Sequence, residues 1–298
     1  MLVLFVAALA DGRAPHEIAE GLHTLRRADD SVLHWSLDRR GTQGRQGVLV
    51  LAQGSGCLPA EKSAALRSAK SLLPEFAVLT VEKYGVSPDD APTDPMGGCS
   101  AEFYAKHTIS QRAADYAQTM TEIRSQPWFD GRVVLFGGSE GAAALAQAAD
   151  AIRPNAVVIY SAGIGLPLRQ MVKEVVPPAV ATAMDAELAK IRAEPKSSKL
   201  WGGNSFRWWA DAVDRVYVRD LLKTDVPVLL IHGGKDRSAP VAAARAARDA
   251  YVAACRKNLT YREYPDLDHA MRDAAGKSHT SMVFREITIW LRGVLARQ

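Results

Sequence analysis

The sequence predicts an α/β fold in which a mostly parallel sheet is covered by helices on both faces. Apolar, β-branched runs typical of buried strands alternate with alanine- and leucine-rich segments typical of helices. A glycine-rich turn at 137–141 joins one such strand to its helix, at the sheet edge where α/β proteins place their chemistry. The 298 residues are enough for one large domain or two small ones.

A hairpin is expected to open the sheet, with strands at 21–27 and 31–38 joined by a turn at Ala28-Asp29-Asp30. Six further strands are predicted at 48–52, 77–82, 132–136, 156–160, 227–231 and 259–264. Helices are predicted at 60–72, 107–125, 140–151, 241–254 and 280–296. These segments together predict a sheet of eight strands.

Composition excludes several function classes. The chain is 48% apolar and 23% charged, with a net charge of +4, which is typical of an ordinary globular protein. No Lys/Arg cluster interleaved with aromatic residues indicates nucleic-acid binding. No apolar stretch reaches the roughly 18 residues of a membrane span. The sequence lacks a phosphate loop, a Gly-x-Gly-x-x-Gly turn and a metal-ligand cluster, so neither a cofactor nor a metal is expected.

The segment Gly137-Gly138-Ser139-Glu140-Gly141 follows the apolar run 133–136 and leads directly into an alanine-rich helix. A strand, a tight Gly-x-Ser-x-Gly turn and a helix are typical of a nucleophile elbow, which holds a serine hydroxyl at the sheet edge. Glycines flank the serine because side chains there would collide across the turn. Ser139 is therefore the predicted nucleophile; the alternative is an ordinary glycine-rich loop.

A serine nucleophile needs a base, and the base needs an acid that orients it. Asp236 lies just beyond the strand at 227–231 and is the predicted acid, although turn and helix-cap roles are open to it. Asp266 and Asp268 are rival acids, but they lie too close in sequence to the histidine that they would have to orient. That histidine is His269, in the loop between the last strand and the closing helix, and it is the predicted base.

The oxyanion of a tetrahedral intermediate needs two N–H donors. The backbone N–H of Glu140, directly after the nucleophile, is expected to be one. The strand at 48–52 ends in Gln53-Gly54-Ser55-Gly56, where glycines permit close approach of the backbone to a substrate. The N–H of Ser55 is the predicted second donor, with that of Gly56 as the alternative.

Together these residues resemble the α/β-hydrolase superfamily over about residues 20–297, most closely at Gly137–Gly141, His232–Val241 and His269. The resemblance implies the α/β-hydrolase fold, with an eight-stranded, mostly parallel sheet, flanking helices and a small helical cap insertion. One departure is Gln53-Gly54, where many members carry His-Gly. The Ser-Glu-Gly sequence occurs in esterase-, peptidase- and thioesterase-like relatives and so does not define the substrate.

The alternation of strands and helices breaks between Ser161 and Leu222, where relatives insert a cap. We therefore expect a core formed by 11–160 and 223–298, and a cap or lid formed by 161–222. Trp208 and Trp209 in this segment are predicted to line an apolar substrate pocket. The alternative is that they anchor the cap to the core.

The first ten residues are apolar and end in Ala8-Leu9-Ala10, which matches a signal-peptide cleavage site although the segment is short. This predicts a periplasmic or secreted protein; the alternative is a buried first strand in a cytoplasmic protein. The fold places Cys57 and Cys99 in loops near the active-site edge, where a disulfide is expected, unless both are free cytosolic thiols. Cys255 would then be a leftover thiol.

The predicted function is hydrolysis of a carboxylic ester through an acyl-enzyme formed on Ser139, with a small-molecule or peptide acyl substrate. Peptide, amide and thioester bonds are alternatives on the same residues. A non-catalytic binding protein on this fold is the alternative from another class. The sequence does not define an oligomeric state.

Overall fold

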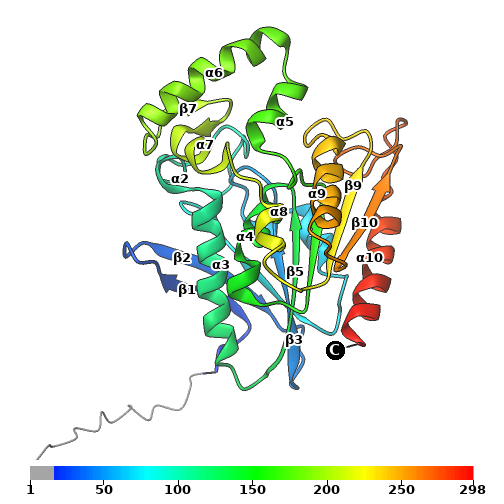
Figure 1. The fold of residues 1–298 in the computed structure, drawn as a ribbon. Coiled ribbons are helices and arrows are strands. Elements are labelled where there is room, and N and C mark those ends of the chain that lie inside the picture. The colour runs from blue at the N-terminus through cyan, green and yellow to red at the C-terminus, as the bar shows by residue number, and fades with distance from the viewer. Residues whose placement is uncertain (1–16, 298) are drawn as a thin grey trace, which may run out of the picture.

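The computed structural model describes residues 17–297, and its centre is a sheet of eight strands (Figure 1). In chain order the strands are β1 (Gly21–Arg26), β2 (Val32–Asp38), β3 (Gln46–Ala52), β4 (Ala77–Val81), β5 (Phe129–Gly138), β6 (Ala156–Tyr160), β9 (Val228–Gly233) and β10 (Leu259–Tyr264). Their order across the sheet is β1-β2-β4-β3-β5-β6-β9-β10. The pairs β1–β2 and β2–β4 are antiparallel and all the others are parallel. The predicted eight-stranded, mostly parallel sheet is confirmed.

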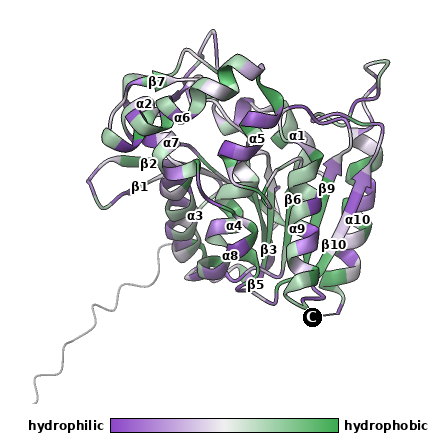
Figure 2. Cartoon of the chain, turned by 45° about the horizontal axis from the view of Figure 1, so that its top comes forward, coloured by the Kyte–Doolittle hydropathy of each residue, from purple (hydrophilic) through white to green (hydrophobic). Residues whose placement is uncertain are grey.

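Alternate residues of the central strands contribute to two separate cores. On β3, Val48 and Val50 pack with residues of α3 (Ile109–Arg124), α4 (Glu140–Ile152) and α9 (Val241–Ala253). Leu49 and Leu51 point to the other face and pack with residues of α1 (Ala64–Ala69) and α10 (Thr280–Leu295). Both faces of the sheet are thus covered, which explains why its central strands are apolar throughout. Figure 2 shows hydrophobic residues concentrated in these strands.

The helices follow the prediction with two differences. The expected helix at 60–72 is a short 3-10 turn, Ala60–Lys62, followed by α1. The break falls at Ser63, whose backbone is extended and whose hydroxyl accepts a hydrogen bond from the N–H of Leu66 as an N-cap. The second difference is α2 (Ala101–Lys106), which the sequence did not reveal because it is less than two turns long.

The segment between β6 and β9 contains α5 (Leu168–Val175), α6 (Pro178–Ala193), the short strands β7 (Leu200–Trp201) and β8 (Asn204–Ser205), α7 (Phe206–Ala212) and α8 (Val218–Leu221). Figure 1 shows α5, α6 and α7 above the carboxyl ends of the sheet strands. In contrast, α8 packs beside α4 in the helical layer of the core. Thus α8 belongs to the helical layer of the core although it lies within the predicted cap segment 161–222. The boundaries of the cap stay a prediction.

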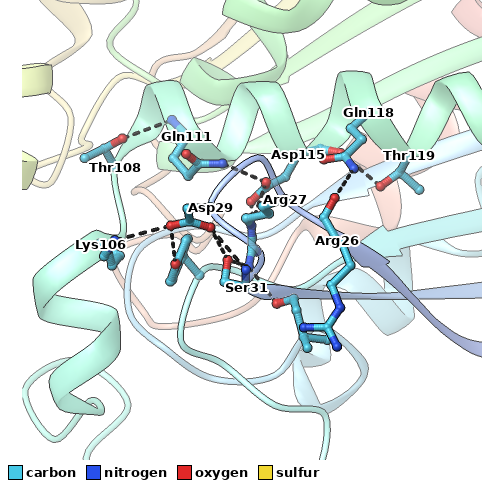
Figure 3. Close-up of polar contacts among 12 residues, drawn as sticks. Arg26, Arg27, Asp29, Ser31, Lys106, Thr108, Gln111, Asp115, Gln118 and Thr119 are labelled. Atoms are coloured by element: carbon cyan, nitrogen blue, oxygen red, sulfur yellow. Dashed lines mark hydrogen bonds and ion pairs between the residues drawn. The ribbon is translucent and has the colours of Figure 1, made fainter.

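The β1–β2 hairpin is fastened to the helices by charged side chains (Figure 3). Arg27 donates two hydrogen bonds to the buried carboxylate of Asp115 on α3, with N···O distances of 2.9 and 3.1 Å. Asp29 in the turn pairs with Lys106 at 3.2 Å and accepts a hydrogen bond from the hydroxyl of Tyr84 at 2.7 Å. These contacts connect the edge of the sheet to the loop that follows β4.

Three further predictions concern a leader segment, membrane-spanning helices and metal binding. The possible leader at 1–10 lies outside the described residues. Within 17–297, no helix is long and apolar enough to cross a membrane. Over the same residues, no group of three or more His, Cys, Asp or Glu side chains is placed to hold a metal ion.

Candidate active site

Ser139 lies in the turn between β5 and α4, with φ +50° and ψ −123°. A serine seldom adopts such a conformation, and it persists only where the surrounding structure holds it. The turn is tight on both sides: a Cβ on Gly137 would lie 2.5 Å from the Cα of Ala142, and one on Gly141 only 2.3 Å from the carbonyl oxygen of Ala52. The structure therefore has the strand, strained turn and helix of a nucleophile elbow.

The structure brings His269 and Asp236 together. The Nδ1 atom of His269 lies 2.7 Å from Oδ2 of Asp236, whose carboxylate is fully buried. The other oxygen of Asp236 accepts hydrogen bonds from the N–H groups of Ser238 and Ala239, both at 2.8 Å. These bonds fix the carboxylate, so that it can hold Nδ1–H and leave Nε2 of His269 free to accept a proton. His269 and Ser139 line the same cleft.

The rival acids have other positions. The Oδ1 atom of Asp268 accepts hydrogen bonds from the backbone N–H groups of Ala270 and Arg272, at 2.9 and 2.8 Å. That is the arrangement of a turn aspartate. Asp266 is exposed. Of the three carboxylates that the sequence offers, the structure places only that of Asp236 against His269.

His232 is a structural partner of the same turn. Its Nε2 lies 2.8 Å from the carbonyl oxygen of Ala239 and 3.3 Å from Oδ2 of Asp236. Burial lowers the pKa of His232, so the imidazole is neutral at neutral pH and donates from Nε2. It thereby helps to hold the carboxylate that faces His269.

The loop with the predicted oxyanion donor Ser55 is held by a buried lysine. Lys83, in the loop after β4, has a fully buried side chain whose Nζ lies 2.5 Å from the carbonyl oxygens of both Gly54 and Gly56. Ser55, between these two glycines, lines a pocket together with Ser139 and Glu140. Both predicted N–H donors thus belong to residues on the wall of one pocket that also contains the predicted nucleophile.

Glu140 is the centre of a buried polar cluster. Its carboxylate lies 3.5 Å from Nζ of Lys83, 3.2 Å from Nε2 of His107 and 3.3 Å from a guanidinium nitrogen of Arg112. The indole N–H of Trp208 donates to its other oxygen at 3.2 Å. Lys83 contacts both the Gly54–Gly56 loop and this carboxylate, so it connects the two segments that carry the predicted donors.

The ionisation of this cluster follows from burial and charge. Burial opposes ionisation of Glu140, but Lys83, His107 and Arg112 outweigh it and hold its pKa well below the usual range. Burial lowers the pKa of Lys83 to about 7 and lowers that of His107, which favours a neutral imidazole. Glu140 is therefore a buried anion that Lys83 and Arg112 compensate by charge and His107 by a hydrogen bond, and it helps to stabilise the turn rather than exchanging protons.

Two hollows meet at Ser139. The larger is an open cleft of about 960 Å³ whose wall includes Ser139, His269, α1 and the start of α10. The smaller, of about 150 Å³, lies under the cap and is lined by Ser139, Ser55 and Glu140 together with mostly apolar side chains: Ile109, Ala143, Ile164, Leu168, Met171 and Trp208. Ser139 lines both hollows. His269 lines the cleft but not the small pocket, whereas Ser55 and Glu140, which carry the predicted oxyanion donors, line the small pocket but not the cleft.

The structure separates the two predicted pocket tryptophans. Trp208 lines the small pocket. Trp209 lines neither hollow; its indole N–H donates to the carbonyl oxygen of Trp201 at 2.7 Å, and its ring packs on that of Trp201 with centroids 4.7 Å apart. Trp209 therefore has the contacts of a side chain that stabilises the cap.

The predicted disulfide is present between Cys57 and Cys99, with a Cα–Cα distance of 5.7 Å. It joins the loop after β3 to the long segment before α2. The N–H of Cys57 also donates to the carbonyl oxygen of Pro95 at 2.8 Å. The loop that carries Ser55 is thus restrained by Lys83 on one side and by the disulfide on the other. Cys255 is a free, exposed thiol.

Sequence reasoning missed three residues of the site: Lys83, His107 and Arg112. They come from the loop after β4, the end of α2 and α3, and they meet only at Glu140. None belongs to a recognisable motif. The one available signal was a pair of charged residues, Glu82 and Lys83, directly after a buried strand.

No family model and no curated protein matches the sequence. Solved structures are nevertheless similar. Est1E from Butyrivibrio proteoclasticus, in a structure with bound ferulic acid, has a TM-score of 0.64 at 17% identity, over 91% of this chain and 98% of that chain. Alpha/beta hydrolase domain-containing protein 10 from mouse has a TM-score of 0.55 at 14% identity, over 92% of this chain and 99% of that chain.

Part of a larger protein is also similar. Porphyromonas gingivalis dipeptidyl peptidase 4 has a TM-score of 0.57 at 12% identity, over 93% of this chain but 36% of that chain. These likenesses, together with the sheet order and the elbow, show that the chain has the α/β-hydrolase fold. The predicted fold class is confirmed.

Proposed function

We propose that this protein is a serine hydrolase that cleaves carboxylic esters through an acyl-enzyme. The observation that carries the proposal is the His269–Asp236 pair, 2.7 Å apart, in the cleft that also contains Ser139 on its strained turn. A serine nucleophile, a base and an acid that orients the base are the three parts that acyl transfer requires.

In the proposed mechanism, His269 accepts the proton of Ser139 as the hydroxyl attacks the substrate carbonyl carbon. Asp236 stabilises the resulting imidazolium. The N–H groups of Ser55 and Glu140 bind the oxyanion of the tetrahedral intermediate. His269 then gives its proton to the leaving oxygen, which leaves the acyl group on Ser139. A water molecule attacks this acyl-enzyme as His269 takes its proton, and His269 returns that proton to the Ser139 oxygen as the acid product leaves.

The small pocket under the cap is the proposed acyl site, because the residues with the predicted oxyanion donors line it. Its volume of about 150 Å³ and apolar wall suit a short aliphatic acyl group or a single aromatic ring. An apolar cavity of similar size can bind benzene. The bound ferulic acid of the similar Est1E structure, an aromatic acid, is consistent with this choice.

Peptide, amide or thioester cleavage is the alternative within the class, and the similar dipeptidyl peptidase keeps it open. A non-catalytic binding protein is the alternative from another class. The buried charges around Glu140 argue against the latter, because holding a charge in the core is costly unless the site requires it.

Covalent labelling tests the proposal. A fluorophosphonate probe is expected to label the wild-type protein once, on the peptide that contains Ser139, and Ser139→Ala is expected to abolish labelling. Absence of labelling in folded wild-type protein would favour the binding protein. A panel of phenyl ester, anilide and thioester substrates with the same acyl group then identifies the bond.

The acid assignment has its own test. Both His269→Ala and Asp236→Asn are expected to lower kcat by orders of magnitude, because the triad acts as a unit. Asp268→Asn is the matched control and is expected to keep kcat, since its carboxylate caps a turn. An inactive Asp268→Asn beside an active Asp236→Asn would contradict the assignment.

Export to the periplasm or the medium is part of the proposal. It is supported by the Cys57–Cys99 disulfide, a bond that persists in oxidising compartments. Non-reducing peptide mapping of protein from its native host tests this: a linked Cys57–Cys99 peptide is expected, and two free thiols would contradict export.

A further inference from the structure

Three arginines from three different elements line the open cleft beside Ser139. Arg67 belongs to α1, Arg272 to the loop after β10, and Arg285 to the second turn of α10. The residues that line the cleft include no Asp or Glu. Serine and threonine residues also line it, but the hydroxyls of Ser68, Ser71, Thr280 and Thr288 donate to backbone carbonyl oxygens of the protein itself. The charged side chains that line the cleft are therefore cationic, with no carboxylate among them.

The carboxylates nearest to these arginines along the chain are engaged elsewhere. Glu61 pairs with Lys70 at 2.8 Å, Asp273 pairs with His279 at 2.8 Å, and Glu286 accepts a hydrogen bond from Tyr264. Asp268 caps its own turn.

The guanidinium groups themselves are largely available. That of Arg67 donates to the carbonyl oxygen of Glu61, which leaves its charge unpaired. Across residues 17–297, the guanidinium groups of Arg272 and Arg285 have neither an ion pair nor a hydrogen bond. The positive charge that lines the cleft is thus available to a ligand.

The position of His269 shows which part of a substrate would occupy the cleft. The base that activates the nucleophile also protonates the leaving oxygen, so the leaving group must lie on the side of the base. His269 lines the cleft and the predicted oxyanion donors line the small pocket. Building on the proposed function, this arrangement puts the acyl group in the small pocket and the leaving alcohol in the open cleft, from which it can depart.

We propose that the natural leaving alcohol of this hydrolase carries an anionic group, a carboxylate or a phosphate, which Arg67, Arg272 and Arg285 bind. Guanidinium groups suit both anions, because their forked N–H donors match the spacing of the oxygens. The arginines are exposed, so their attraction acts at the mouth of the cleft and is screened by salt.

Aryl acetates with one acyl group and different leaving groups test this. The substrates are phenyl acetate, meta-carboxyphenyl acetate, meta-phosphonooxyphenyl acetate and meta-trimethylammoniophenyl acetate. For each, the kcat/KM of a variant is divided by that of the wild type, which cancels the intrinsic reactivity of the ester. Arg272→Gln and Arg285→Gln are each expected to lower the ratio for the two anionic esters, relative to phenyl acetate, by about two- to fivefold.

The cationic ester is expected to shift in the opposite direction, and all differences are expected to shrink as salt is added. The anionic ester whose kcat/KM falls more in the arginine variants, the carboxylate or the phosphate, carries the anion that the cleft prefers. Arg292→Gln is the matched control: Arg292 is exposed on the same helix, about two turns further along, and does not line the cleft. Its ratios are expected to equal those of the wild type.

Binding of the product separates this inference from the proposed function, because it needs no turnover. Titration calorimetry with meta-hydroxybenzoate, meta-hydroxyphenyl phosphate and phenol is expected to show tighter binding of an anionic product than of phenol, and the Arg272→Gln/Arg285→Gln double variant is expected to lose that preference. Equal binding of all three ligands, or ester ratios that the arginine substitutions do not move, would overturn the inference even where Ser139 is labelled. Failure of labelling would instead overturn the proposed function.

Discussion

Glu140 is a buried carboxylate that contacts side chains from four separate segments of the chain. Lys83, His107, Arg112 and Trp208 all approach it within 3.5 Å. Removing one partner of a buried charge is costly because the remaining charge is left without compensation in a medium of low dielectric. Glu140, the residue directly after Ser139, is therefore held by electrostatics, and the backbone of the turn is held with it.

Glu82 is a second buried carboxylate, and it makes stability depend on pH. It accepts hydrogen bonds from the N–H of Ala60, yet burial raises its pKa from 4.5 to about 7. Between these values the unfolded chain has lost the proton and the folded protein has kept it. The folded state is then relatively destabilised as pH rises through this window, by at most about 3 kcal/mol.

Substitution Glu82→Gln is expected to remove this contribution. The free energy of unfolding of the wild type should fall relative to that of the variant as pH rises from 4.5 to 7, and the difference should stay constant at higher pH. Urea unfolding at a series of pH values measures it. A difference that is flat across the window would show that Glu82 ionises normally.

At the scale of elements, the loop after β3 is positioned by the loop after β4. Lys83 binds the carbonyl oxygens on both sides of Ser55 and also lies against Glu140. The next residue, Tyr84, donates to Asp29 of the β1–β2 turn and lies under the guanidinium of Arg27, 4.3 Å from its ring centroid. A continuous set of polar contacts thus runs from the hairpin to the predicted oxyanion site.

Lys83→Met is expected to lower kcat by up to about 100-fold and to slow fluorophosphonate labelling of Ser139, because small displacements of oxyanion donors are costly. KM should change less, since the small pocket keeps its apolar wall. Lys83→Arg is expected to recover part of the activity by keeping the charge. Lys62→Met, which removes an exposed lysine bound to backbone oxygens of a surface loop, is the control. Equal kcat values for both Met variants would contradict a positioning role.

The two cap tryptophans are expected to respond differently. Trp208→Ala should shift preference toward larger acyl groups, by about 1–3 kcal/mol in ratios of kcat/KM, because Trp208 lines the small pocket. Trp208→Phe keeps most of the ring but loses the donor to Glu140, which separates pocket shape from hydrogen bonding. Trp209→Ala should cost about 3–5 kcal/mol of stability and leave chain-length preference unchanged. If Trp209→Ala instead changed acyl preference and Trp208→Ala mainly lowered stability, Trp209 would be the pocket residue and Trp208 the side chain that stabilises the cap.

For the whole molecule, the disulfide joins two cysteines 42 positions apart in the sequence, and the segment between them contains α1 and β4. Restricting the unfolded chain by a loop of this length stabilises the folded state by about 3–4 kcal/mol. A Cys57→Ser/Cys99→Ser double variant is expected to lose up to that amount in chemical unfolding, and its activity should become more sensitive to temperature. Cys255→Ser is the control, because that thiol is exposed and free. Equal stability of the two variants would contradict a stabilising disulfide.

The sequence by itself determined the eight strands of the sheet, most of the helices that cover it, the tight turn around Ser139, and the candidates for the acid and base of the proposed triad. These features depend on short windows, because apolar periodicity and turn chemistry act over a few residues. The same windows could not reveal that the expected helix at 60–72 breaks at Ser63, since its apolar pattern continues past the cap.

Only the tertiary structure decided which candidates meet. It put Asp236 rather than Asp268 against His269, placed Trp208 at the pocket and Trp209 in the cap, and surrounded Glu140 with cations that no motif announces. It also brought Arg67 into one cleft with arginines more than 200 positions away. The physical reason is that buried charges and pocket walls are assembled from distant segments, whose approach is set by packing of the two cores and not by local sequence.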